Sequence, residues 1–151
     1  LAGEILYVAR SPKPDAEAAL GAERVELAQL LRRADVVSIH APAGPDTRHL
    51  IGAAELESMR EHAVLVNTAR GSLVDSAALA RALADATIGA AGLDVFEHEP
   101  DVPAELLAAP RCVLLPHIGS ATRTARDAMA RLAAQNALAV LAGAEPPNQV
   151  R

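Results

Sequence analysis

The sequence predicts an α/β fold built on a doubly wound parallel sheet. Short apolar runs alternate along the chain with segments of helical periodicity, and the connections between them are short. The run at residues 64–66 is continuously apolar, which is typical of a parallel strand that is buried on both faces. Such an alternation favours parallel strands joined by right-handed crossovers.

Strands are predicted wherever a short apolar run is bounded by polar residues or proline. The predicted strands cover residues 5–9, 35–40, 64–66, 88–95 and 113–115. Pro12 and Pro14 stop the first of them, since proline removes a backbone donor and fixes φ. The segment 10–14 is therefore predicted to be a loop at the end of a strand.

Helices are predicted between these strands and after the last one. The predicted helices cover residues 26–33, 53–59, 76–86 and 122–142. Asp75 is placed to cap the third helix, because an aspartate side chain accepts hydrogen bonds from the first turn. Gly143 is placed to end the last helix, with Pro146 and Pro147 just beyond it.

The composition excludes several classes of protein. The chain has 151 residues, of which 51% are hydrophobic, so it can bury a core and is not expected to be disordered. A formal net charge of -5 and only two aromatic side chains, Tyr7 and Phe96, argue against a nucleic-acid partner. No apolar run is long enough to span a bilayer. Cys112 is the only cysteine, which excludes an internal disulfide and favours a reducing, cytoplasmic location.

Polar side chains follow three of the predicted strands, in segments 67–71, 94–100 and 116–120. In a parallel sheet these loops open at one edge, where an arginine, a carboxylate and an imidazole would converge. An imidazolium can protonate a carbonyl oxygen while hydride adds to carbon, with a carboxylate to orient the ring and an arginine to hold the substrate. Other interpretations stay open at this point: a solvated arginine in a turn, a structural histidine beside a proline, and a solvated Glu-His-Glu loop. A metal site is a weaker alternative, because no ligand pair has the required spacing on a helix.

Four motifs, in this order, resemble those of the D-isomer-specific 2-hydroxyacid dehydrogenases. They lie at residues 38–42 with Thr47, 67–75, 92–100 and 116–120, so the resemblance covers nearly the whole chain. It implies a Rossmann-type fold and a hydride transfer between NAD(P)H and a small 2-keto acid of the glyoxylate or hydroxypyruvate type. By this resemblance Arg70 binds and polarises the substrate, Glu99 pairs with the histidine, and His117 donates and accepts the proton.

The same resemblance implies a set of cofactor-binding residues. Asp94 would hold the nicotinamide carboxamide, and Ser120 would lie near the nicotinamide ring. Others would line the cofactor: Pro42, Thr47, Thr68 and Ala69.

The end of the first predicted strand favours NADP(H) over NAD(H), although NAD(H) stays possible. NAD-dependent members of the family carry an acidic residue here, which bonds the adenosine ribose. In this sequence the strand is followed by Arg10 and Ser11, with Lys13 close by. A cation and a hydroxyl suit a 2′-phosphate, whereas a carboxylate would repel it.

The chain departs from the family pattern in two places. No Gly-x-Gly-x-x-Gly motif occurs, so the first strand and the glycine-rich turn of the dinucleotide fold are expected to be missing. By family analogy that strand would lie between the strands at residues 5–9 and 64–66. The substrate domain that precedes it in the family is expected to be missing too.

We therefore interpret the chain as the carboxyl-terminal portion of a dehydrogenase. Residues 1–121 would be a partial dinucleotide-binding domain, and residues 122–151 a helix and tail that return to the missing substrate domain. Alone it is expected to turn over little or nothing, and the longer protein is expected to be a homodimer. The alternative is a non-catalytic, nucleotide-sensing module like the corepressors that share this fold. A formate dehydrogenase is disfavoured by Glu99, because that relative carries an amide there.

Overall fold

The structure is a computed structural model that describes residues 3–149. It divides into two compact units, Leu1–Pro116 and His117–Arg151. The first unit contains every β-strand of the described residues, and the second contains one long helix followed by a tail.

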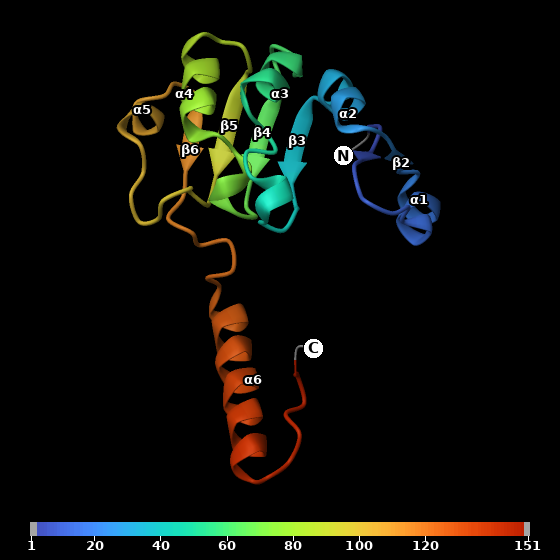
Figure 1. The fold of residues 1–151 in the computed structure, drawn as a ribbon, viewed down its shortest axis with the longest axis vertical. Coiled ribbons are helices and arrows are strands. Elements are labelled where there is room, and N and C mark those ends of the chain that lie inside the picture. The colour runs from blue at the N-terminus through green and yellow to red at the C-terminus, as the bar shows by residue number, and fades with distance from the viewer. Residues whose placement is uncertain (1–2, 150–151) are drawn as a thin grey trace. The chain divides into compact units, whose positions relative to one another are not determined.

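The main sheet of the first unit is parallel throughout, as predicted (Figure 1). Its strands, in spatial order, are β3 (Val36–Ile39), β4 (Val64–Asn67), β5 (Ala90–Leu93) and β6 (Cys112–Leu114). Asn67 of β4 is in register with Ile39 of β3 and with Leu93 of β5, and Leu93 is in register with Leu114. The carboxyl ends of all four strands therefore lie level at one edge of the sheet.

The order of the strands in the sheet is also their order along the chain, so every crossover proceeds in the same direction. Right-handed crossovers of this kind put all the connecting helices on one face. The connecting helices are α3 (Ala53–Ser58), α4 (Ser76–Ala84) and α5 (Ala104–Leu107). Helix α2 (Leu27–Arg33) precedes β3, and its buried leucine shares one core with those of the connecting helices and with the strands. On β3 only Val37 and Ile39 are buried, whereas Val36 is 60% exposed. In the described residues the main sheet thus carries one of the two helical layers of a doubly wound fold.

The predicted elements correspond to those observed. Strands β1, β3 and β5 are shorter than predicted, β4 continues one residue further to Asn67, and β6 begins and ends one residue earlier. Asp75 caps α4 as predicted, since its side chain accepts a hydrogen bond from the N–H of Ala78 at 2.9 Å. Two short helical turns, η1 (Pro45–Thr47) and η2 (Gly71–Leu73), and helix α5 lie in segments where no helix was predicted. Each of these spans only three or four residues, which is too short for hydrophobic periodicity to reveal.

A second, two-stranded parallel sheet precedes the main one. Its strands are β1 (Leu6–Tyr7) and β2 (Glu23–Arg24), joined by α1 (Pro14–Leu20). The sequence predicted β1 over a longer range, and did not predict α1 or β2. No residue of α1 is buried, so no apolar stripe marks this helix in the sequence. Its Pro14 lies in the first turn, where proline is tolerated in a helix.

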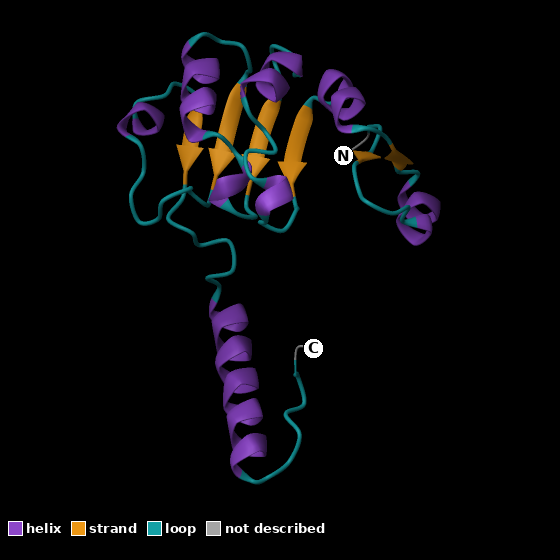
Figure 2. Ribbon diagram, viewed as in Figure 1, coloured by secondary structure: helices purple, strands orange, loops and turns teal. Residues whose placement is uncertain are grey.

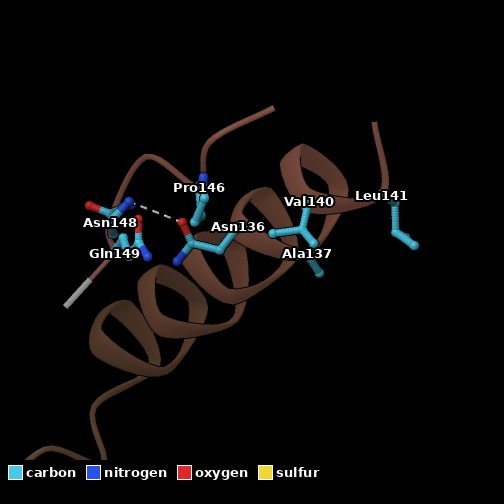
Figure 3. A pocket seen from close by; sticks show the side chains of 7 residues that line it. All are labelled: Asn136, Ala137, Val140, Leu141, Pro146, Asn148 and Gln149. Carbon is cyan, nitrogen blue, oxygen red and sulfur yellow. Dashed lines mark hydrogen bonds between the residues drawn. The ribbon is translucent and has the colours of Figure 1, made fainter. Parts of the chain in front are cut away.

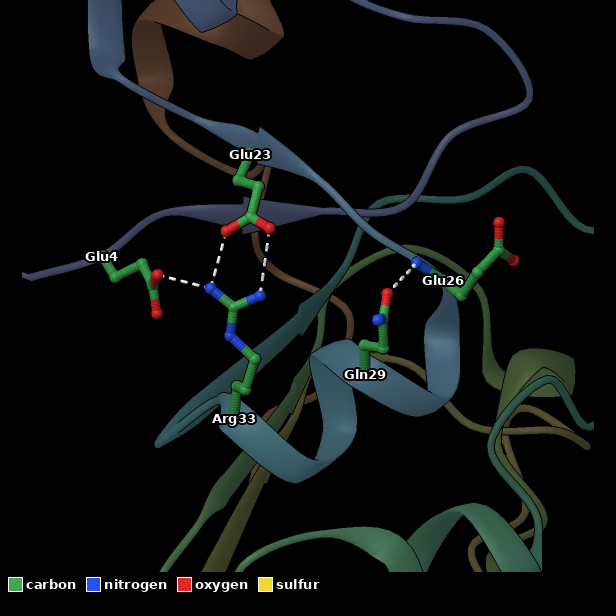
Figure 4. Close-up of polar contacts among 5 residues, drawn as sticks. All are labelled: Glu4, Glu23, Glu26, Gln29 and Arg33. Atoms are coloured by element: carbon green, nitrogen blue, oxygen red, sulfur yellow. Dashed lines mark hydrogen bonds and ion pairs between the residues drawn. The ribbon is translucent and has the colours of Figure 1, made fainter.

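Arg33 of α2 ties this small sheet to the helix that follows it (Figure 4). Its guanidinium pairs with Glu23 at 2.6 Å and also with Glu4, which precedes β1. The hydrogen bonds from Arg33 lower the pKa of the Glu23 carboxyl. In the same helix, the side chain of Gln29 accepts a hydrogen bond from the N–H of Glu26 at 3.3 Å.

The prediction that an absent strand would lie beside the strand at residues 64–66 is wrong. Both edges of β4 are occupied, because Val64 pairs with Val36 of β3 and with Ala90 of β5. Among the described strands, β3 is an edge strand of the main sheet, because it pairs with β4 alone. The sequence could not distinguish these positions, since strand order is decided by pairing between distant segments.

The second unit consists of α6 (Arg123–Leu141) and the tail behind it. Thr122 caps the helix by accepting a hydrogen bond from the N–H of Ala125 at 3.1 Å, and Gly143 ends it with a positive φ of 73°. No residue of α6 is buried in the described structure, and Met129 is 53% exposed. Within the described residues, no helix has the length and apolar character needed to cross a membrane.

The tail folds back along α6 and leaves an open hollow of about 600 Å³ (Figure 3). The N–H of Asn148 donates to the side-chain oxygen of Asn136 at 3.1 Å, which holds the tail near the helix. The hollow is lined by Asn136, Ala137, Val140, Leu141, Pro146, Asn148 and Gln149. None of the residues predicted to act on substrate or cofactor is among them.

Candidate active site

The loops after β3, β4 and β5 all leave the same edge of the main sheet (Figure 2). Seven of the predicted residues of the first unit lie there: Pro42 and Thr47 after β3, Thr68, Ala69 and Arg70 after β4, and Asp94 and Glu99 after β5. The prediction that these strands are parallel and end together is confirmed. His117 and Ser120 belong to the second unit, and their part in the site stays a prediction.

The turn that carries Arg70 is built on a buried asparagine. Asn67 is 1% exposed, and its side-chain amide donates to the carbonyl of Arg70 at 2.9 Å. Its side-chain oxygen accepts from the N–H of Ala69 at 3.0 Å. These two bonds hold the backbone of the turn. The Arg70 side chain is exposed, and within the part of the chain that the structure describes it donates only to the carbonyl of Ala69, at 2.6 Å. The fork of Arg70 remains accessible to a carboxylate, the ligand that suits its geometry.

Sequence reasoning did not identify Asn67 as a structural residue. The available signal was a polar residue that continues an apolar strand without interruption. A buried amide must satisfy both its donor and its acceptor, and a tight turn offers backbone groups for each.

The loop after β5 lies against the loop after β4 at Gly71. A Cβ atom at this position would come within 1.9 Å of the carbonyl carbon of Phe96 and 2.4 Å of the nitrogen of Glu97. Only glycine allows so close an approach of the two backbones. Next to this contact, the N–H of Asp94 donates to the carbonyl of Asn67 at 3.0 Å. The loops that carry Arg70 and Glu99 are therefore in direct backbone contact.

Two carboxyl groups of the β5 loop that the resemblance assigns to the site differ in their environment. Asp94, at the end of β5, is 3% exposed. Glu99 is exposed, and one of its oxygens accepts a hydrogen bond from the N–H of Phe96 at 2.9 Å. This bond closes the loop on itself and leaves the Glu99 carboxylate at the surface.

A third carboxyl group, Glu97, is held by an ion-pair cluster that sequence reasoning missed. Its side chain is only 10% exposed and pairs with Arg48 at 2.6 Å and with the Nε2 atom of His49 at 2.9 Å. Burial alone would raise the pKa of Glu97. The hydrogen bond from His49 and the charges of His49, Arg48 and His98 outweigh burial and lower that pKa below its ordinary value. The interpretation of the Glu-His-Glu run as a solvated loop is wrong for Glu97, because the loop after β3 supplies a cation to cover it.

We expect Glu97→Gln to destabilise the first unit by about 1–3 kcal/mol at pH 7. The change removes the anion paired with Arg48 and leaves His49 only the carboxylate of Asp75, at 3.9 Å. The folded-state pKa of Glu97 is lowered, so its contribution is complete above the unfolded pKa and is lost as the pH falls through the folded pKa. Urea unfolding of both proteins at pH 7 and below pH ~4 measures this difference. If the difference in free energy of unfolding between the unmodified chain and Glu97→Gln is the same in acid as at pH 7, the ionic role of Glu97 is contradicted.

The loop after β3 is fixed by Thr47. Its hydroxyl donates to the carbonyl of Pro42 at 2.8 Å, while the same oxygen lies 3.3 Å from the carbonyl oxygen of Gly44. The two residues predicted to line a cofactor in this loop are thus bonded to each other. Arg10 and Ser11 lie elsewhere, in the exposed loop after β1 of the small sheet.

No group of three histidine, cysteine, aspartate or glutamate side chains within residues 3–149 is arranged to hold a metal ion. The polar groups at the sheet edge are instead an exposed guanidinium and carboxylates in loops that touch each other. This set suits a substrate with its own carboxylate and a carbonyl to be polarised.

Comparison with known proteins places these motifs in a family. A family model described as the NAD binding domain of D-isomer specific 2-hydroxyacid dehydrogenase matches residues 1–119. The glyoxylate reductase of Thermococcus litoralis is 48% identical over 147 residues, which are 97% of this chain and 44% of that protein. The glyoxylate reductase of Aeropyrum pernix is 50% identical over 147 residues, again 97% of this chain and 44% of that protein.

Solved structures give the same result. The TT0316 protein from Thermus thermophilus has a TM-score of 0.90 and 48% identity, and the match covers 98% of this chain and 46% of that one. The NADPH-dependent glyoxylate/hydroxypyruvate reductase from Sinorhizobium meliloti, in complex with NADP and malonate, has a TM-score of 0.89 and 37% identity. That match covers 99% of this chain and 46% of the other. The chain spans a little under half the length of these relatives.

Proposed function

This chain belongs to the D-isomer specific 2-hydroxyacid dehydrogenase family, and from that premise we propose that it is the carboxyl-terminal portion of an NAD(P)-dependent reductase. The reaction is a hydride transfer between NAD(P)H and a small 2-keto acid of the glyoxylate or hydroxypyruvate type. The substrate class follows relatives named as glyoxylate reductases, each of which this chain covers in part.

One observation carries the proposal: Arg70 and Glu99 follow adjacent parallel strands, in loops that touch at Gly71. In an open α/β sheet, ligands bind at the carboxyl ends of the strands. A guanidinium at that edge can bind and polarise a 2-keto acid, and a carboxylate can orient an imidazole that donates the proton.

The residue roles follow from their chemistry. Arg70 binds the substrate carboxylate or keto oxygen through its planar fork and polarises the carbonyl. His117 gives its proton to the carbonyl oxygen in reduction and removes it in oxidation. Glu99 orients the imidazole and balances its charge. The nicotinamide cofactor, when bound, supplies or accepts the hydride.

The residues present fit such a cofactor. Asp94 is a carboxylate at the carboxyl end of β5 and can accept hydrogen bonds from a carboxamide. Thr47 and Pro42 are bonded to each other in the loop after β3, and Thr68 and Ala69 follow β4, the strand that pairs with β3. We assign these residues, with Ser120, to cofactor binding.

We further propose a preference for NADP(H), with NAD(H) as the weaker ligand. Arg10, Ser11 and Lys13 lie together in the exposed loop after β1, and none of them is an acid. Two cations and a hydroxyl suit the 2′-phosphate of NADPH.

The change Arg10→Asp is expected to reverse this preference by about 10- to 100-fold in the ratio of kcat/KM for NADPH and NADH. It replaces a charge-assisted hydrogen bond by repulsion of the phosphate. The measurement is steady-state oxidation of each cofactor by the longer polypeptide that includes this chain. An unchanged ratio would remove Arg10 from phosphate recognition.

The reaction itself is tested by following absorbance loss of NADPH or NADH with a panel of 2-keto acids. Reduction of glyoxylate or hydroxypyruvate supports the proposal. Absence of turnover with any 2-keto acid, in the presence of dinucleotide binding, would favour a nucleotide-sensing module. We expect the active polypeptide to be a cytoplasmic homodimer, which sedimentation and cell fractionation can test.

A further inference from the structure

The loop that leaves β1 is held at its start by an arginine from the neighbouring strand. Arg24, in β2, donates from Nε to the carbonyl of Ala9 at 3.0 Å, and its terminal Nη2 lies 2.9 Å from the same oxygen. The Nη2 atom also donates to the carbonyl of Arg10 at 3.2 Å. Two successive peptide carbonyls therefore converge on one guanidinium.

The loop is held at its other end by Tyr7. The phenol oxygen accepts a hydrogen bond from the N–H of Lys13 at 2.8 Å and donates one to Glu17. Desolvation and the bond to Glu17 raise the pKa of Tyr7, so the phenol stays protonated and keeps this donor. The residues between these anchors are Arg10, Ser11 and Pro12.

The carbonyl contacts determine where the amide hydrogens of this loop point. In a trans peptide the N–H is directed opposite to the C=O, and both peptide bonds concerned, 9–10 and 10–11, are trans. Because both carbonyls face Arg24, the N–H groups of Arg10 and Ser11 both point away from it. Within residues 3–149 neither N–H makes a hydrogen bond.

From this arrangement we propose that Arg24 is a specificity-determining residue, which positions the loop 10–13 to receive the phosphate on the adenosine ribose. This inference rests on the NADP(H) preference proposed above. By engaging the carbonyls of Ala9 and Arg10, Arg24 keeps two partial negative charges away from the phosphate. It also turns two amide donors outward beside the side chains of Arg10 and Ser11. Backbone N–H groups of successive residues that are directed away from their carbonyl contacts can donate to an anion together.

The test uses this chain and two probes, adenosine 2′,5′-bisphosphate and adenosine 5′-monophosphate, which differ only in the 2′-phosphate. Heteronuclear NMR titration measures both affinities and reports the amide signals of Arg10 and Ser11 directly. For the unmodified chain we expect tighter binding of the bisphosphate and shifts of both amides. For Arg24→Gln we expect the affinity for the bisphosphate to fall by about tenfold, with that for the monophosphate unchanged.

Two further variants make the result specific. Arg32→Gln removes an equal charge from α2, where the guanidinium makes no hydrogen bond or ion pair with the described residues, and should leave the ratio of affinities unchanged. Arg24→Lys keeps the charge but lacks the fork, so it should retain only part of the preference. If circular dichroism shows that Arg24→Gln is unfolded, a folded Arg24→Lys decides the question.

A preference for the bisphosphate that persists in full in a folded Arg24 variant would overturn the role of Arg24 alone. Equal affinity of the unmodified chain for the two probes would instead overturn the NADP(H) preference, and the role of Arg24 with it. The two failures are therefore distinguishable in one set of titrations.

Discussion

Replacing His117 with alanine is expected to lower kcat for 2-keto acid reduction by about 10²- to 10⁴-fold, which is the usual contribution of a positioned general acid. The carbonyl oxygen would then take its proton from water at the moment of hydride transfer. Binding of the dinucleotide should change little, because an imidazole that acts on the substrate carbonyl contributes little to cofactor affinity. The measurement is steady-state turnover of the longer polypeptide with NADPH and a 2-keto acid, together with cofactor binding by fluorescence.

His62→Ala is the matched control for this experiment. His62 is 67% exposed and pairs with Asp35 at 2.9 Å, just before β4 begins, at the opposite edge of the sheet from Arg70. Its removal should leave kcat within about twofold, since exposed ion pairs contribute little. If His117→Ala lowers kcat no more than His62→Ala does, another group supplies the proton and the role assigned to His117 is wrong.

Gly71→Ala is expected to destabilise the first unit by about 1–3 kcal/mol, the range typical of an overpacked site. The added methyl group would meet the backbone of Phe96 and Glu97 at distances no van der Waals contact allows, so one of the two loops must move. Movement of the second loop would displace Glu99, and we expect activity to fall along with stability. Urea unfolding gives the free energy, and the slope m shows whether two-state behaviour is preserved.

The control for this substitution is Gly92→Ala, in β5. A Cβ atom at Gly92 would have no neighbour within 4 Å. The change should be neutral or stabilising by up to about 1 kcal/mol, because alanine restricts the unfolded chain more than glycine does. Equal effects of the two substitutions would mean that the close approach at Gly71 is not what the glycine provides.

The sequence predicted those parts of the site that depend on the order of apolar and polar residues in one short segment. The apolar run at residues 64–66 indicated a strand, and the polar residues directly after it indicated a loop at the strand's carboxyl end. Because the strands are parallel, the loops that carry Arg70 and Glu99 necessarily reach the same edge. The family motifs then supplied a role for each side chain.

The residues that hold these loops in place could not be predicted in the same way. Glu97 is covered by Arg48 and His49, which are almost fifty residues distant in the chain. Arg24 reaches the carbonyls of Ala9 and Arg10 across a strand pair of only two residues each. Such contacts leave no periodic signal, since neither partner lies on an apolar face.

By itself the sequence determined the α/β class, the parallel strands, the cap at Asp75 and the family. These properties depend on hydrophobic periodicity, capping chemistry and motif order, all of which are encoded in neighbouring residues. Only the tertiary structure decided that β3 ends the main sheet, that one face of this sheet carries all the helices α2–α5, and that Gly71 joins two loops. Those features depend on which distant backbones come into contact, and that is set by the packing of the whole unit.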